Sequence, residues 1–136
     1  MKGRDAAALQ HSMEKPATIL IVDDDAALRM LFERCLIVFG YRPMLAADGI
    51  TALRIAGEAP EIRLIMLDVV MPGLSGQRLA EQLRALLPRA AILFCSGHFS
   101  AGLTRLGIDL EEAHFMQKPC RPLELKQRLA EILSAR

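Results

Sequence analysis

The stretch LIMLDVVMPG, Leu64 to Gly73, places four apolar residues directly before Asp68, with a Met-Pro-Gly turn shortly after it. Successive apolar residues are typical of a strand that is covered on both faces, as the strands of parallel sheets are. A carboxylate inside the core of such a sheet would cost several kcal/mol. We therefore expect Asp68 at the end of the strand, where it faces solvent or a cation.

Four further short segments carry the same kind of signal: TILIV (18–22), YRPMLA (41–46), AILFC (91–95) and HFM (114–116). We expect YRPMLA at an edge of the sheet, because Pro43 has no N–H to donate to a neighbouring strand.

Helical patterns separate these strands. They comprise an apolar stripe of Leu28, Leu31, Phe32, Cys35, Leu36 and Phe39 that Gly40 ends, a helix from Gly49 to Ala59, a stripe from Leu79 to Leu87 with Ser75 as a cap and Pro88 as a stop, and a last helix from Pro122 to Leu133. The segment from Ser96 to Ala113 contains three glycines and no lasting stripe, and predicts a short or irregular helix. Alternation of strands and helices indicates a doubly wound α/β sheet.

Composition limits the class of protein. The 136 residues suit one domain, and the apolar runs are shorter than the ~18 residues of a membrane span. A formal charge of +1 gives no general attraction to nucleic acid or anionic membrane. The three cysteines form no CxxC pair, which favours reduced thiols and a cytoplasmic location. Residues 1–16 lack a secretory signal and are expected to form a flexible leader before a domain at 17–136.

Polar residues follow four of the strands. Asp23-Asp24-Asp25 follows the first, Asp68 ends the third, Ser96 follows the fourth and Lys118 the fifth. In open α/β sheets, ligands bind outside the carboxyl ends of the strands. Carboxylates that gather there repel one another unless a cation is present, and oxygen ligands without His or Cys select Mg²⁺. A metal, a lysine and a hydroxyl together suit a phosphoryl group, with the most central acid as nucleophile.

The segments ILIVDDD, AADGITAL, LIMLDVVMPGLSG, ILFCSG and FMQKP occur in this order, each at a strand end or in the adjoining loop. In this order they resemble the receiver domain of two-component response regulators, from Thr18 to about Leu133. The resemblance implies a flavodoxin-like five-stranded parallel sheet of strand order 2-1-3-4-5 with helices on both faces. The segment before Lys118 looks most like receivers of hybrid histidine kinases, and the sequence leaves open a single-domain regulator, a phosphate shuttle or the receiver of a larger kinase.

The resemblance also implies roles for individual residues. Asp68 matches the aspartate that accepts a phosphoryl group from the phosphohistidine of a histidine kinase or a phosphotransfer protein. The other matches are Asp24 as a direct Mg²⁺ ligand, Asp23 as a ligand through water, Val70 as the backbone carbonyl of the metal shell, Ser96 as the hydroxyl that moves onto the phosphoryl group, Lys118 as its cationic partner, and Phe115 as the switch aromatic. The Lys118–Pro119 bond is expected to be cis.

This sequence departs from the family at two positions. Asp25 is expected to point away from the metal and to cap the next helix. Cys120 replaces the usual Phe after Lys-Pro, and we interpret it as a small buried thiol. His98 follows the hydroxyl by two positions and either borders the path of attacking water or is an exposed loop residue without a role.

The implied function is a phosphorylation-controlled signalling module that hydrolyses its own phosphoryl group slowly and turns over no metabolite. Its output would be a change on the face of the fourth strand, the fifth strand and the last helix, read by a protein partner or a second copy, with no nucleic acid or membrane involved. A magnesium-dependent phosphatase of haloacid dehalogenase type is one alternative, although it needs a second Asp where Val70 stands. A flavodoxin-like cofactor binder would place phosphate against Asp23–Asp25, which would repel it. A receiver-like scaffold that works without phosphorylation is the remaining alternative.

Overall fold

The computed structural model describes residues 15–69, 76–96, 114–118 and 120–135. Its elements are β1 (Thr18–Val22), α2 (Ala26–Val38), β2 (Arg42–Ala46), α3 (Gly49–Glu58), β3 (Ile62–Asp68), α4 (Gly76–Leu86), β4 (Ala91–Ser96), β5 (His114–Gln117) and α6 (Pro122–Ser134). Among these residues, five parallel strands form one sheet in the order β2-β1-β3-β4-β5. The predicted fold class and strand order are confirmed.

The burial of each strand follows from its sequence. Every residue of β1 and of β4 is buried, and β3 is buried except at Arg63. By contrast, β2 lies at an edge and is only partly buried. Pro43 belongs to β2, and an edge strand tolerates its missing N–H as the sequence predicts.

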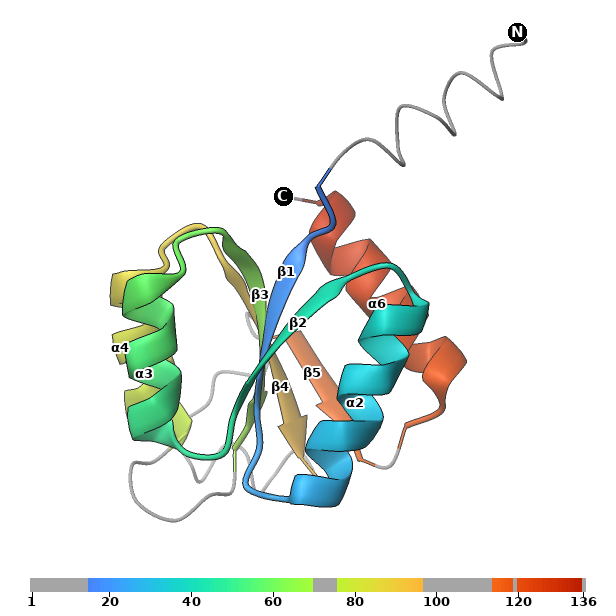
Figure 1. Ribbon diagram of the computed structural model, residues 1–136, viewed down its shortest axis with the longest axis horizontal. Helices are drawn as coiled ribbons and strands as arrows, with labels where there is room; N and C mark the ends of the chain where they lie inside the picture. The colour runs from blue at the N-terminus through green and yellow to red at the C-terminus, as the bar shows by residue number, and fades with distance from the viewer. Residues whose placement is uncertain (1–14, 70–75, 97–113, 119, 136) are drawn as a thin grey trace, which may run out of the picture.

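Helices cover both faces of the sheet, with α3 and α4 on one side and α2 and α6 on the other (Figure 1). Alternate strand residues supply the two halves of the core, because successive side chains of a strand point to opposite faces. Leu20 and Ile65 belong to the cluster that includes residues of α3 and α4, which we call the α3/α4 core. Ile19 and Leu64 belong to the cluster that includes residues of α2 and α6, which we call the α2/α6 core.

The ends of α2 are fixed by particular residues. The Asp25 side chain accepts hydrogen bonds from the N–H groups of Ala27 (2.9 Å) and Leu28 (3.2 Å), so Asp25 is the predicted N-cap. Beyond the other end, Gly40 has a φ of 91°, a left-handed conformation that glycine adopts without strain.

The apolar stripe predicted for α2 is too wide. Phe32 and Leu36 are buried, but Leu31 is 50% exposed. Leu31 is turned about 100° around the helix axis from Phe32, so it lies at the outer edge of the apolar stripe rather than at its centre. The prediction for Leu31 was therefore wrong.

Element boundaries differ slightly from the predicted ones. The strand that includes Asp68 begins two residues earlier than the apolar run, at Ile62, and β4 and β5 each run one residue further than predicted. Predictions that concern Val70, Ser75, the segment 97–113 with His98, and Pro119 lie outside the described residues. Among the described residues, none of the helices is both long and apolar enough to cross a membrane.

Candidate functional site

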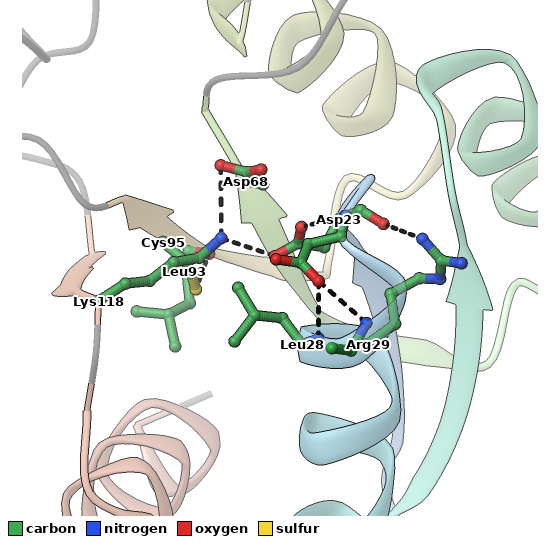
Figure 2. A network of polar contacts seen from close by, with 9 residues as sticks. Asp23, Leu28, Arg29, Asp68, Leu93, Cys95 and Lys118 are labelled. Atoms are coloured by element: carbon green, nitrogen blue, oxygen red, sulfur yellow. Dashed lines mark hydrogen bonds and ion pairs between the residues drawn. The ribbon is translucent and has the colours of Figure 1, made fainter.

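The carboxyl ends of β1, β3, β4 and β5 meet at one edge of the sheet and carry the predicted site. Asp68 is the last residue of β3 and lies opposite Cys95 of β4. Asp23 directly follows β1, and Lys118 directly follows β5. Figure 2 shows the Lys118 side chain reaching between Asp23 and Asp68. Parallel pairing places these strand ends together although they are far apart in the sequence.

Asp23 is held on several sides. Its N–H donates to the carbonyl of Ala46 at 3.1 Å, and its Oδ1 accepts from the N–H of Asp25 at 2.9 Å. Its Oδ2 lies 2.6 Å from Nζ of Lys118. Its carbonyl accepts a 2.7 Å hydrogen bond from Nη1 of Arg29. Asp23 is only 2% exposed, so these contacts replace the water that its polar groups lose on burial.

Lys118 is the cation of the site. Its Nζ lies 3.6 Å from Oδ1 of Asp68, in addition to its shorter contact with Asp23. Its backbone N–H donates to the carbonyl of Ser96 at 2.7 Å, which fixes the start of the side chain. Burial opposes the charged form, but the hydrogen bond to Asp23 and the charges of Asp68 and Asp23 outweigh it and raise the pKa of Lys118. Lys118 is therefore fully protonated at neutral pH.

Three carboxylates form a group that fits a metal ion. One oxygen each of Asp23, Asp24 and Asp68 lies within 4.8 Å of the others. Asp23 and Asp68 are buried, whereas Asp24 is exposed at the rim. Carboxylate oxygens with access to water suit Mg²⁺, which keeps several water ligands. The donor set thus fits the predicted magnesium ion.

Ser96 and Phe115 lie on the two strands beyond β3. Ser96 ends β4 and is fully buried at the same edge as Asp68. Phe115 pairs with Phe94 across β4 and β5, is partly buried and packs against the α3/α4 core. The structure thus brings Ser96 to the site edge and keeps Phe115 three positions before Lys118, within the strand.

Cys120 is more accessible than the sequence predicted. It is partly exposed and packs against the α2/α6 core, beside a cavity of about 250 Å³ that it lines together with Leu28, Leu31, Phe32 and Lys118. Burial raises the pKa of the Cys120 thiol. The thiol is therefore mostly protonated at neutral pH, which does not favour a reactive cysteine.

Arg29 is the site residue that sequence reasoning missed. It is the fourth residue of α2, and its guanidinium reaches back to the carbonyl of Asp23 (Figure 2). A signal existed in the sequence, because a cation that follows a run of three acids by one helical turn faces the start of its helix. The apolar stripe of the same helix carries no information about the contacts of its polar side.

Residues 19–130 match the family of the response regulator receiver domain. The chain belongs to this family. A curated relative, the response regulator MprA of Mycobacterium sp. (strain KMS), is 36% identical over 119 residues, which are 87% of this chain and 51% of the relative. The same protein of Mycobacterium ulcerans (strain Agy99) is 36% identical over 116 residues, 85% of this chain and 49% of the relative. The chain therefore spans about half the length of the curated relatives it matches.

Solved structures support the same assignment. The receiver domain of the hybrid histidine kinase CckA is 34% identical, with a TM-score of 0.73 over 86% of this chain and 99% of that one. The chemotaxis protein CheY4 of Vibrio cholerae is 28% identical, with a TM-score of 0.78 over 87% of this chain and 99% of that one. This receiver domain therefore belongs to two-component signalling, and the family assignment favours neither the phosphatase nor the flavodoxin-like alternative.

Proposed function

We propose that this receiver domain takes a phosphoryl group from the phosphohistidine of a histidine kinase or a phosphotransfer protein onto Asp68, with Mg²⁺ bound beside it. One observation carries the proposal. The carboxylates of Asp23, Asp24 and Asp68 converge at one sheet edge, with the Lys118 ammonium between two of them. Such a group of acids is electrostatically costly unless it binds cations, and its arrangement suits an anionic phosphoryl group held between cations.

In the transfer, an oxygen of the Asp68 carboxylate forms a bond to phosphorus while the phosphorus–nitrogen bond of the phosphohistidine breaks. The electron pair of that bond returns to the imidazole nitrogen, and Asp68 becomes an acyl phosphate. Nζ of Lys118 lies 3.6 Å from the Asp68 carboxylate, so it can stabilise the negative charge on the oxygens of the transferred phosphoryl group. Magnesium, when bound, supplies a further positive charge for the same oxygens.

Ser96 and Phe115 would respond to the phosphoryl group on Asp68 and so change the molecular surface formed by β4, β5 and α6. Ser96 ends β4 one residue after Cys95, the residue opposite Asp68, and we propose that its hydroxyl moves onto the phosphoryl group. Phe115 sits partly buried on β5 and can repack when Ser96 moves. We propose that the face of β4, β5 and α6 is then read by a protein partner or a second copy. Phosphorylation would act by shifting the balance between two packings.

The cycle ends with slow hydrolysis of the acyl phosphate rather than with turnover of a metabolite. Each phosphorylation uses one donor and leaves the domain modified until water attacks. We propose that the protein acts in the cytoplasm and that, with a formal charge of +1, it binds neither nucleic acid nor membrane.

Incubation with Mg²⁺ and acetyl phosphate, followed by intact-protein mass spectrometry, tests the proposal. The wild type should gain one phosphoryl group, and Asp68→Asn should gain none. Asp25→Asn is the matched control, because asparagine caps a helix as well as aspartate does and Asp25 faces its own helix. It should be phosphorylated like the wild type.

Two results would contradict the proposal. Absence of any gain in the folded wild type would favour a scaffold that works without phosphorylation. Rapid multiple-turnover release of phosphate from many substrates would favour the phosphatase.

A further inference from the structure

We propose that Arg29 is a positioning residue that holds the peptide group between Asp23 and Asp24 and so sets the orientation of both carboxylates toward the cation. The proposal rests on the magnesium role proposed above. It adds a residue outside the acidic cluster, on a helix that otherwise packs against the sheet.

The contact itself is short and specific. Nη1 of Arg29 donates to the carbonyl oxygen of Asp23 at 2.7 Å, in a partly buried setting (Figure 2). The backbone N–H of Arg29 donates to the carbonyl of Asp25 at 2.9 Å, as the helix requires. Arg29 is thus joined to the loop between β1 and α2 both through its backbone and through its side chain. A charge-assisted hydrogen bond of this length is stronger than a neutral one.

The peptide bond transmits this contact to both acids. The carbonyl of Asp23 and the N–H of Asp24 belong to one planar unit. A hydrogen bond to the Asp23 carbonyl oxygen therefore restricts the orientation of this peptide plane, to which the Cα atoms of both Asp23 and Asp24 belong. The Asp23 side chain has further anchors at Asp25 and Lys118. Asp24 is exposed, so its direction depends more on the backbone that carries it.

Charge and geometry predict opposite effects on magnesium binding. The Arg29 guanidinium is positive and repels a divalent cation nearby, so its charge alone weakens the binding of Mg²⁺. Loss of that charge would then tighten binding. Loss of a positioning contact would weaken it, because residues that orient metal ligands typically change metal affinity about 10- to 100-fold. The sign of the change therefore separates the two roles.

The test is calorimetric titration of the full chain with MgCl₂, which needs no phosphodonor. Arg29→Met should bind Mg²⁺ about ten-fold more weakly than the wild type. Arg29→Lys keeps the charge and one donor on a long chain, and should recover part of the loss. Arg34→Met removes the same charge from an exposed position of the same helix and should bind at least as tightly as the wild type.

The outcomes are distinct. If folded Arg29→Met bound Mg²⁺ as tightly as the wild type or more tightly, the positioning role would be overturned. Binding of Mg²⁺ by the wild type would still support the magnesium proposal. If wild type and Arg34→Met both failed to bind Mg²⁺, the magnesium proposal itself would fail. Should Arg29→Met unfold in circular dichroism, Arg29→Lys decides. Its charge is unchanged, so weaker binding supports positioning and wild-type binding overturns it.

Discussion

Replacing Lys118 by methionine removes the ammonium group that contacts the acids and keeps most of the length of the side chain. In the wild type, Nζ lies 2.6 Å from Oδ2 of Asp23 and 3.6 Å from Oδ1 of Asp68. Both carboxylates are buried, with side chains 3% and 9% exposed. The variant would leave two buried negative charges facing each other without a cation.

The magnitude follows from these distances. Two unit charges about 4 Å apart interact by about 4 kcal/mol at an effective dielectric constant of about 20. Removing one partner of a buried ion pair costs about 3–5 kcal/mol. Asp24 is exposed at the rim, so water reaches the site and the lower end of this range applies. We expect the metal-free protein to lose about 3 kcal/mol of unfolding free energy.

Urea unfolding followed by circular dichroism measures this loss. In EDTA, the urea midpoint of Lys118→Met should lie roughly 1.5 M below that of the wild type for an m-value of about 2 kcal/mol/M. Magnesium should stabilise the variant more than the wild type. In the variant the metal relieves the repulsion between Asp23 and Asp68, which Lys118 neutralises in the wild type. Arg121→Met is the matched control, since it removes one positive charge from an exposed position of the same loop and should change little.

Wild-type stability of Lys118→Met in EDTA would show that Lys118 does not stabilise the two carboxylates. Equal stabilisation of both proteins by magnesium would show that the lysine and the metal do not share the same carboxylates.

Other predictions concern pH, thiols and two glycines. The pKa of Lys118 is raised above its ordinary 10.5, so the stability that its charge provides is fully present below pH 10.5 and is lost as the pH rises further. In metal-free urea unfolding, the free energy of unfolding of the wild type should therefore fall above that pH, and that of Lys118→Met should fall less. Iodoacetamide should label the partly exposed Cys120 slowly in the native protein, because its thiol is mostly protonated, and should label Cys95 only after unfolding, because Cys95 is 2% exposed with a strongly raised pKa; peptide mass spectrometry measures both. A Cβ on Gly76 would lie 3.2 Å from the backbone just after β3, so Gly76→Ala should lower the unfolding free energy by about 1 kcal/mol. Gly57→Ala, with open space in α3, should raise it by about 0.5–1 kcal/mol in the same urea experiment.

Strands were the most predictable part of the fold. The predicted bounds of β1 agree with the structure, because TILIV is apolar throughout and buried throughout. The start of β3 was missed because Arg63 interrupts the apolar pattern after Ile62. Its guanidinium reaches the carbonyl of Leu133 at 3.4 Å, so the charge leaves the sheet while the backbone continues in it. Hydrophobic patterns cannot report that a long polar side chain bends away from its own strand.

The width of a buried helix face was less predictable. Periodicity assigns Leu31 to the same apolar stripe of α2 as Phe32. The packing of the helix against the sheet decides how much of that stripe is buried. The same limit applies to Cys120, which lies beside a cavity rather than inside the core.

Strand order was enough to predict which residues share the site edge, because parallel strands end together. It could not predict the contacts within it. Lys118 lies nearer to Asp23 than to Asp68, and this depends on side-chain conformations that no spacing encodes. The contact of Arg29 with a backbone carbonyl is likewise invisible to residue patterns, since every residue has a carbonyl.

Mapping the phosphorylated residue decides whether Asp68 is the phosphoacceptor. The domain is phosphorylated with acetyl phosphate and Mg²⁺, the acyl phosphate is reduced with borohydride to homoserine, and the modified residue is located by peptide mass spectrometry. Homoserine is expected at position 68 only, and none is expected when Mg²⁺ is replaced by EDTA. Homoserine at position 23 or 24 instead would contradict this expectation, and so would equal labelling without the metal.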